Sequence, residues 1–231
     1  MGTSFINKIG IIIQARIGSK RLPGKVLRPI AGHPLLEHVL GRLKNLKTNV
    51  VIIVATSLED QDDSIVDFCT NYDVNYYRGS ERDVLARFYE CARKYRFAHI
   101  VRLTADNPFT DIDELDRLIE LHISEENDYT HSFGYLPLGV GAEVFTYNAL
   151  ERSFHEGQSP NHREHVNEYI QENPDKFIIG QLKISKDKTC PDLRLTVDTE
   201  EDYQRACHIA EHAHGDWLTT AEAIDLCLHS V

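Results

Sequence analysis

The first residues that could do chemistry form a basic loop near the start of the chain. Residues 14–25 read QARIGSKRLPGK and directly follow a run of apolar residues. Gly18 and Gly24 allow the backbone to approach an anion closely. The loop contains four cations within ten residues: Arg16, Lys20, Arg21 and Lys25. Because the chain has a net charge of −11, this concentration of positive charge predicts a polyphosphate site; a solvated basic loop is the alternative.

The loop matches neither of two common phosphate-binding motifs. Five residues rather than four separate Gly18 from Gly24, and Val26 stands where a Walker A motif has the Ser or Thr that contacts Mg²⁺. The spacing is not that of G-x-G-x-x-G either. The prediction therefore depends on the charges and on the position after a strand, where ligands of open α/β sheets bind.

Two aspartates form a second candidate site. Asp106 follows the stretch IVRLTA, and Asp198 follows LRLTV, so each stands at the end of an apolar segment. Two carboxylates at the carboxyl ends of strands suit Mg²⁺, which takes few carboxylates and adds phosphate oxygens and water. The alternative is helix capping, since Asp198 precedes an acidic helix, whereas Pro108 separates Asp106 from the next one.

Two further groups lie just before or at the start of a predicted helix. Gly79 and Ser80 are predicted to line a base or ribose pocket, although Ser80 and Asp83 could instead cap the helix. Arg163 and His165 lie at another helix start, where the guanidinium could bind a carboxylate or phosphonate through two hydrogen bonds. A solvated helix start is the alternative for this second group.

Alternating strands and helices must position these residues. In the first two-thirds, strands are predicted at 9–14, 49–55, 74–77 and 99–104, and helices at 34–43, 62–72, 83–95 and from 111 onward. In the last third, strands are predicted at 128–131, 143–146, 177–184 and 193–197, and helices at 148–155, 163–172, 200–214 and 220–228. The pattern predicts an α/β fold with a mainly parallel sheet. A single domain, 1–231, is expected, with 134–185 as a lobe or dimerisation arm.

The composition is that of an ordinary globular protein, with 42% hydrophobic and 26% charged residues. The net negative charge argues against nucleic acid or an anionic membrane as a partner. The apolar run Ile9–Ile13 is too short for a signal sequence or a membrane span. The cysteines are odd in number and form no C-x-x-C pair, so reduced thiols of a cytoplasmic protein are expected. His208 and His212 have metal-ligand spacing without a third ligand, and a solvated helix face is expected.

Five motifs, in order, resemble those of the cytidylyltransferases that activate acidic sugars, the CMP-Kdo and CMP-sialic acid synthetases. The closer likeness is to the SpsF-type branch associated with spore coat polysaccharide. The motifs are QARxGSxRLPGK at 14–25, GSExDVL at 79–85, RxTADxP at 102–108, REHV at 163–166 and LRxTVDTxED at 193–202. The resemblance implies a three-layer α/β/α nucleotide-diphospho-sugar transferase-like fold with a mixed, mainly parallel sheet, usually as a homodimer.

The resemblance also implies residue roles. Arg16, Ser19 and Lys25 would hold the triphosphate of CTP, and Asp106 and Asp198 would bind Mg²⁺. The nucleotide-binding residues are then Gln14, Ala15, Arg16, Gly18, Ser19, Arg21, Lys25, Thr56, Gly79, Ser80 and Thr104. His131, Glu143, Arg163 and His165 are expected to bind the acceptor.

These roles predict nucleotidyl transfer, with Arg16, Lys25 and Asp106 as catalytic residues. An oxygen of a small anionic acceptor, an acidic 2-keto sugar or similar, would attack the α-phosphorus of CTP and release pyrophosphate. The product would serve surface polysaccharide or glycoconjugate synthesis. The alternatives are a nucleotide-sugar-dependent glycosyltransferase, for which 111–113 offers a D-x-D sequence, and a protein that binds CTP without turnover.

Two segments depart from the family pattern where the acceptor is expected. Residues 104–108 read TADNP, where the Kdo enzymes have QGDEP. Residues 139–145 read GVGAEVF, which lacks the aspartate of the usual acidic segment but keeps Glu143. The identity of the acceptor therefore stays open.

Overall fold

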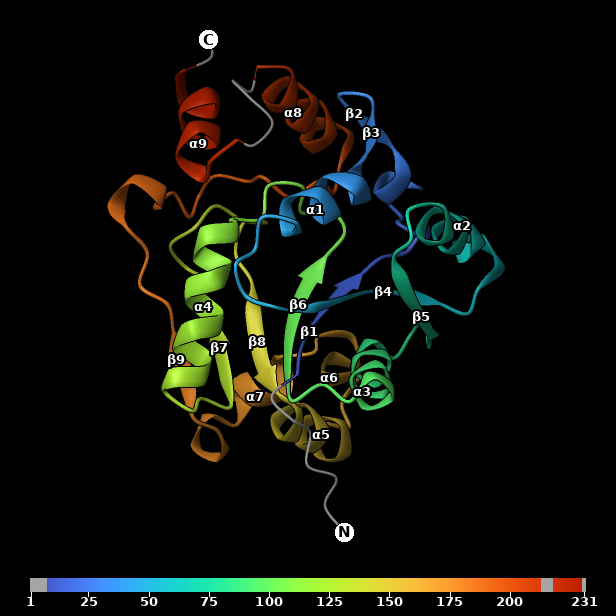
Figure 1. Cartoon of the computed structure of the whole chain (residues 1–231), viewed down its shortest axis with the longest axis vertical. Helices are drawn as coiled ribbons and strands as arrows, with labels where there is room; N and C mark the ends of the chain where they lie inside the picture. Colours follow the sequence, from blue (N-terminus) through green and yellow to red (C-terminus); the bar gives the residue numbers. More distant parts are fainter. Residues whose placement is uncertain (1–7, 213–217, 230–231) are drawn as a thin grey trace.

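A twisted, mixed β-sheet forms the centre of the protein (Figure 1). The computed structural model describes residues 8–212 and 218–229. Within them, seven strands pair in the order β5-β4-β1-β6-β8-β7-β9. Their bounds are β1 Ile9–Gln14, β4 Val51–Ser57, β5 Asn75–Gly79, β6 His99–Thr104, β7 Tyr129–His131, β8 Glu143–Thr146 and β9 Ile179–Gln181. Strands β5, β4, β1 and β6 are mutually parallel, and β8 is antiparallel to both β6 and β7. The predicted mixed, mainly parallel sheet is confirmed.

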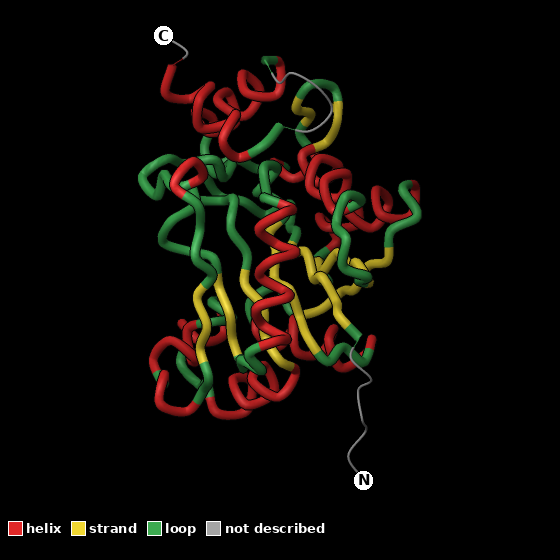
Figure 2. Tube along the Cα trace, turned by 60° about the vertical axis from the view of Figure 1, so that its left-hand side comes forward, coloured by secondary structure: helices red, strands yellow, loops and turns green. Residues whose placement is uncertain are grey.

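Helices cover both faces of this sheet (Figure 2). Their bounds are α1 Leu35–Leu43, α2 Asp63–Asn71, α3 Val84–Tyr95, α4 Ile112–Ser124, α5 Tyr147–Glu156, α6 Pro160–Glu164, α7 Glu168–Glu172, α8 Glu200–Glu211 and α9 Thr220–His229. Helices α1, α2 and α4 contribute to the core on one face, and α3, α5 and α7 contribute to the core on the other. In the described part of the chain, no helix has both the length and the apolar character needed to cross a bilayer.

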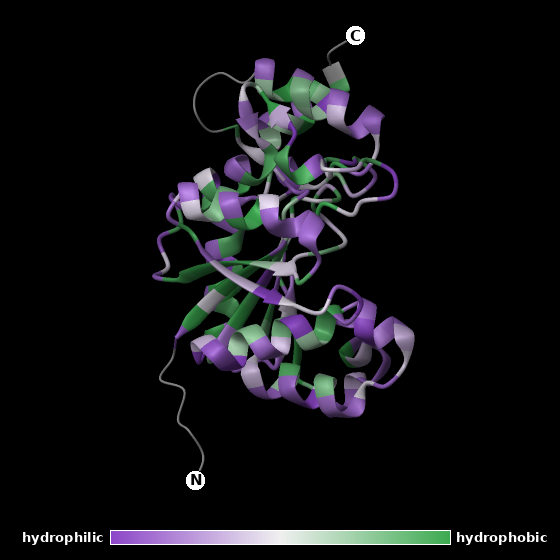
Figure 3. Ribbon diagram, turned by 90° about the vertical axis from the view of Figure 1, so that its right-hand side faces the viewer, coloured by the Kyte–Doolittle hydropathy of each residue, from purple (hydrophilic) through white to green (hydrophobic). Residues whose placement is uncertain are grey.

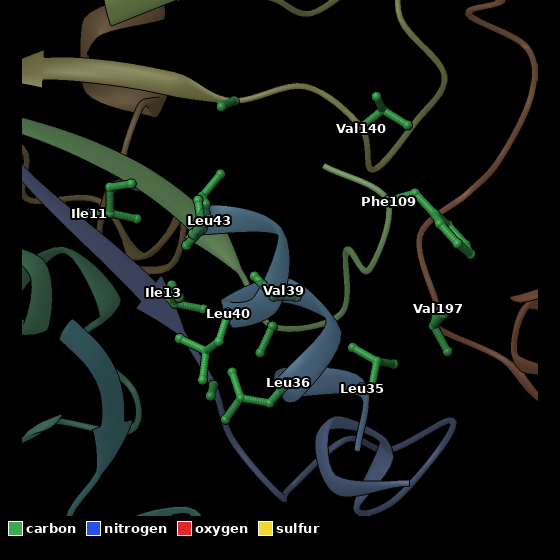
Figure 4. Packing of buried hydrophobic residues seen from close by; sticks show 14 of the residues in the cluster. Ile11, Ile13, Leu35, Leu36, Val39, Leu40, Leu43, Phe109, Val140 and Val197 are labelled. Atoms are coloured by element: carbon green, nitrogen blue, oxygen red, sulfur yellow. The ribbon is translucent and has the colours of Figure 1, made fainter. Parts of the chain in front are cut away.

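The central strand β1 is apolar on both sides because it lies between the two cores. Ile11 and Ile13 belong to one core and Ile12 to the other, and all three are fully buried. Apolar side chains of α1 lie against Ile11 and Ile13 (Figure 4). Hydrophobic residues concentrate along the strands, while polar residues cover the outer sides of the helices (Figure 3). The alternation of burial explains why an unbroken apolar run forms this strand.

Four predicted elements of the last third differ from the structure. Residues 193–197 form no strand of the sheet and make only an isolated bridge from Arg194 to Leu138. The predicted helix 163–172 is two short helices, α6 and α7, separated by residues 165–167, of which His165 is extended. The predicted strand 177–184 is reduced to β9, and the helix predicted to reach His214 ends at Glu211 within the described residues; His214 lies outside them.

Candidate functional site

The basic loop after β1 folds around the carbonyl of Ile17. This carbonyl accepts hydrogen bonds from the N–H of Ser19 at 2.7 Å and from the N–H of Gly24 at 3.0 Å. Gly24 has a φ of +69°, a left-handed conformation that favours glycine, and it precedes the 3₁₀ turn η1 (Lys25–Leu27). The loop is therefore closed by its own backbone, and its charged side chains are presented from a fixed base.

Asp62 anchors this loop to the neighbouring strand β4. Its carboxylate accepts hydrogen bonds from the N–H of Ile17 at 2.7 Å and from the N–H and hydroxyl of Ser57 at 3.1 and 2.5 Å. Burial by itself would raise the pKa of this carboxyl, but the Ile17 and Ser57 donors hold the pKa below its ordinary value. The sequence analysis missed Asp62, because an acid at a helix start is a common surface feature.

The four cations of the loop line one cavity of about 420 Å³ at the carboxyl ends of β1 and β6. The other predicted site residues in its lining are Gln14, Gly18, Ser19, Thr104, Asp106 and Asp198. Glu81 and Glu164, which the sequence analysis did not single out, complete the polar wall. The structure thus gathers residues from all five motifs around one polar space, which is lined by four cations and four carboxylates.

Lys25 joins the two predicted metal ligands. Its Nζ donates to Asp106 Oδ2 at 2.6 Å, to Asp198 Oδ1 at 2.7 Å and to the carbonyl of Val197 at 2.9 Å. The Lys25 side chain is 8% exposed, whereas those of Asp106 and Asp198 are 24% and 22% exposed. The other oxygen of Asp106 accepts from the Thr104 hydroxyl at 2.5 Å. The ammonium therefore lies between the two carboxylates.

Asp198 is held by cations and does not cap helix α8. Arg194 forms an ion pair with its second oxygen. Thr199 is the N-cap of α8, and Asp202 completes a capping box with it. The capping alternative for Asp198 is therefore wrong. Burial would raise the pKa of Asp198, but the hydrogen bond and charge of Lys25 hold it below its ordinary value.

The aspartate pair fits a divalent cation in its donor chemistry. Asp106 and Asp198 offer hard carboxylate oxygens on a cavity wall, and Mg²⁺ takes few carboxylates when phosphate oxygens and water complete its shell. Among the described residues, no group of three or more His, Cys, Asp or Glu is arranged to hold a metal, so His208 and His212 belong to no such group. Phosphates of a nucleotide would have to supply the remaining ligands. Lys25 contacts the same carboxylate oxygens, so its ammonium and a cation compete for them.

A second cavity of about 640 Å³ adjoins the first, and the two share Thr104, Asp106 and Asp198 in their linings. Its remaining wall comes from β6, from the segment 133–141 and from residues near 191–196. Gly139 has a φ of +96°, and a Cβ there would lie 2.6 Å from the Thr196 nitrogen. Only glycine permits this close approach, which brings the segment carrying Asp198 to the sheet.

Four predicted nucleotide-binding residues do not line either cavity of the described structure. Ala15 is buried, and its N–H donates to a β4 carbonyl at 3.0 Å. Thr56 is buried in β4, and Gly79 is buried at the end of β5. The Ser80 hydroxyl accepts from the N–H of Asp83 at 3.0 Å, which is part of a helix-capping turn. Roles for these residues in recognising the base stay predictions.

The four predicted acceptor-binding residues do not lie together in one cavity. His165 lines the second cavity, whereas in the described structure the other three do not line either one. Glu143 is fully buried in the sheet. His131 lies beside it in register on β7, and burial lowers the pKa of its imidazole. Arg163 forms an ion pair with Asp83 at 3.5 Å.

The D-x-D sequence at 111–113 has a structural role. Asp111 is the N-cap of α4, where it accepts from the N–H of Glu114 at 3.0 Å, and its other oxygen pairs with Lys188 at 2.9 Å. Asp113 is exposed on the helix surface. Asp111 also shows that Asp106 is not needed as a cap for this helix. The arrangement gives no support to a metal site of the glycosyltransferase kind.

The sheet order, the cation-rich loop after β1 and the aspartates beside it define an α/β nucleotidyltransferase fold. A family model described as Cytidylyltransferase matches residues 10–224. The chain therefore belongs to the cytidylyltransferase family.

Relatives and solved structures agree with this assignment. The chain is 41% identical over 205 residues to an uncharacterized protein of Methanocaldococcus jannaschii, covering 89% of this chain and 84% of that one. It is 37% identical over 204 residues to the spore coat polysaccharide biosynthesis protein SpsF of Bacillus subtilis, covering 86% and 85%. A cytidylyltransferase structure from Leptospira borgpetersenii superposes with a TM-score of 0.89 at 31% identity, over 95% and 93% of the two chains. The fold is also that of a CMP:2-keto-3-deoxy-manno-octonic acid synthetase complexed with CTP, with a TM-score of 0.69 at 17% identity, over 89% and 100%.

Proposed function

We propose that this chain transfers CMP from CTP to an acidic 2-keto sugar or a similar anionic acceptor and releases pyrophosphate, with Mg²⁺ as its metal. The observation that carries the proposal is the pair of adjoining cavities that meet at Thr104, Asp106 and Asp198. One cavity holds the four loop cations and suits a triphosphate. The other shares the aspartates with it and would hold the acceptor.

The main difficulty of this reaction is electrostatic, because an anionic acceptor must approach a triphosphate of about four negative charges. Positioning and charge neutralisation are therefore the main tasks of the protein. Arg16, Lys20 and Arg21 would neutralise the triphosphate from the loop. Lys25 would exchange its aspartate contacts for phosphate oxygens as the nucleotide enters.

The chemical step forms a bond between the acceptor oxygen and the α-phosphorus and breaks the bond from that phosphorus to the β-phosphate oxygen. The proton of the acceptor hydroxyl passes to solvent, and pyrophosphate carries away the electron pair. Asp106 and Asp198 would hold the divalent cation. When bound, such a cation polarises the α-phosphate and lowers the pKa of the attacking hydroxyl.

The cellular setting is proposed on chemical grounds. The five cysteines are free in the structure, which suits a reducing, cytoplasmic compartment. The likeness to SpsF supports a role in surface polysaccharide or glycoconjugate synthesis. A homodimer, with residues 134–185 as a contributing arm, is proposed from the family resemblance, and light scattering on the purified chain tests it.

Pyrophosphate release tests the reaction. CTP, UTP, ATP and GTP are each supplied with Mg²⁺ and a panel of 2-keto acid sugars and phosphonates, and CTP binding is measured separately by calorimetry. Release that needs both CTP and one acceptor supports the proposal and identifies the acceptor. Absence of CTP binding refutes the nucleotide site, and transfer from a nucleotide sugar would favour the glycosyltransferase alternative.

A further inference from the structure

A buried ion pair lies beneath the wall of the second cavity. Arg102 on β6 stands opposite Glu143 on β8, and its Nη1 donates to Glu143 Oε1 at 2.5 Å. The second oxygen of Glu143 accepts from the Tyr129 hydroxyl at 2.6 Å, and this hydroxyl accepts from Asn167 Nδ2 at 3.2 Å. The Glu143 side chain is 1% exposed, so both of its oxygens are used inside the protein.

The ion pair with Glu143 occupies only part of the Arg102 guanidinium. Its side chain is 19% exposed and lines the second cavity, whereas Glu143 does not. Within the described structure, Nη1 is the guanidinium nitrogen with a hydrogen bond, and Nε is buried without a partner. A guanidinium has five N–H donors in a planar fork, and a buried donor without an acceptor is costly. Because Nε is buried, the exposed part of Arg102 that remains for a ligand is Nη2 together with the second N–H of Nη1.

The rest of this cavity offers little else to an anion. Asp106 and Asp198 stand at the end shared with the nucleotide cavity and repel negative charge. The opposite wall is apolar or glycine over 133–141, with Phe133, Leu136 and Leu138 in the lining. Among the described lining residues, Arg102 is the one permanent cation, and His165 is the other group that can become positive.

We infer that Arg102 binds the acid group of the acceptor and that Glu143 and Tyr129 are positioning residues that fix its guanidinium. This inference rests on the proposed function and deepens it. It assigns recognition of the acceptor's acid group to Arg102 in the sheet rather than to Arg163 at the start of a helix. The ion pair with Glu143 orients Arg102, and a guanidinium binds a planar carboxylate through two parallel hydrogen bonds.

The test compares an acid with its neutral ester. The probes are N-acetylneuraminate, 3-deoxy-manno-octulosonate and the methyl ester of each, measured by calorimetry and by pyrophosphate release with CTP. Arg102→Gln alone leaves Glu143 buried and unpaired, so the main variant is the double change Arg102→Gln with Glu143→Gln, which removes both charges. Arg102→Lys keeps the charge without the planar fork. Arg117→Gln is the matched control, since Arg117 also pairs with a buried glutamate, at 2.5 Å, but lines neither cavity.

We expect the double variant to raise the KM for the acid about 10- to 100-fold, the loss of one charge-assisted contact, while the KM for CTP stays within about threefold. The wild-type preference for acid over ester should disappear in the double variant, shrink in Arg102→Lys and persist in Arg117→Gln. An unchanged acid preference in the double variant, or no binding of either acid to the wild type, overturns the inference. CTP binding on the same samples separates this result from failure of the proposed function.

Discussion

Replacing Lys25 by Met removes the ammonium between Asp106 and Asp198 while keeping a side chain of similar length. In the wild type, Nζ lies 2.6 and 2.7 Å from the two carboxylates. A divalent cation must displace this ammonium from the oxygens that it would bind. The Lys25→Met protein should therefore bind such a cation more tightly than the wild type when no nucleotide is present.

The magnitude follows from charge and exposure. Two unit charges about 4 Å apart attract by roughly 4 kcal/mol at an effective dielectric of about 20. Because both aspartates are partly exposed, solvent screening and desolvation reduce this to a net of about 1.5–3 kcal/mol. We therefore expect Mn²⁺ to bind about 10- to 100-fold more tightly to Lys25→Met. Without metal the variant should be less stable by about 2 kcal/mol, because two carboxylates lose a partner.

The assay is a calorimetric titration of Mn²⁺ without nucleotide, with electron paramagnetic resonance to count the bound ion. Lys20→Met is the matched control, because Lys20 lines the same cavity without an ion pair to either aspartate among the described contacts. Its Mn²⁺ affinity should change much less. Adding Asp106→Asn to Lys25→Met should abolish the gain. Equal Mn²⁺ affinity for Lys25→Met and the wild type would refute the competition between ammonium and cation. Turnover of Lys25→Met should still fall by on the order of 10²-fold, since the leaving pyrophosphate loses a cation.

Three further predictions concern other parts of the structure. Asp106→Asn should abolish metal-dependent pyrophosphate release while circular dichroism shows an intact fold; wild-type activity at the same metal optimum would exclude Asp106 from the site. Burial lowers the pKa of His122 to about 3, so below pH 6.5 the folded state binds fewer protons than the unfolded state and stability falls as pH falls, by about 1.4 kcal/mol per unit. Urea unfolding between pH 7 and 5 should show this slope in the wild type and a flatter one in His122→Asn. His208→Gln is the control and should keep the slope, because His208 is exposed. An unchanged slope in His122→Asn would contradict the prediction. Gly139→Ala should lower the free energy of unfolding by at least about 2 kcal/mol more than Gly134→Ala does. Both glycines have positive φ, but a Cβ at 139 would lie 2.6 Å from a backbone nitrogen, whereas one at 134 would lie 3.6 Å from a side chain. Equal thermal unfolding temperatures of the two variants would contradict this.

The local sequence was sufficient for most elements of the first two-thirds. Apolar runs buried on both faces and amphipathic stretches have periodicities that depend only on neighbours in the chain, so β1 and β6 were predicted with the bounds that the structure shows. The position of the basic loop after β1 followed from the same reasoning. Because β1 and β6 are parallel neighbours, the loop after β1 and Asp106 after β6 lie at the same edge of the sheet.

The tertiary structure alone decided how Asp198 reaches the site. The segment 193–197 has the alternation of a strand, yet it pairs with Leu138 and with the carbonyl of Asp106 instead of joining the sheet. The local pattern specifies that a segment can be extended, but not its partners, since Arg194 bridges to Leu138 across 56 residues and Val197 bonds to Asp106 across 91. A close approach at Gly139 selects that partner.

The contacts of the charged residues also depended on the tertiary structure. The sequence identified Lys25 and Glu143 as residues of the site from their motifs, and both are important in the structure. That Lys25 lies between two aspartates, and that Glu143 is buried behind Arg102, depends on strand register and on which strands are neighbours. Charge pairs form between side chains that the fold brings together, so the sequence determined which charges are present and the tertiary structure decided which of them remain free for a ligand.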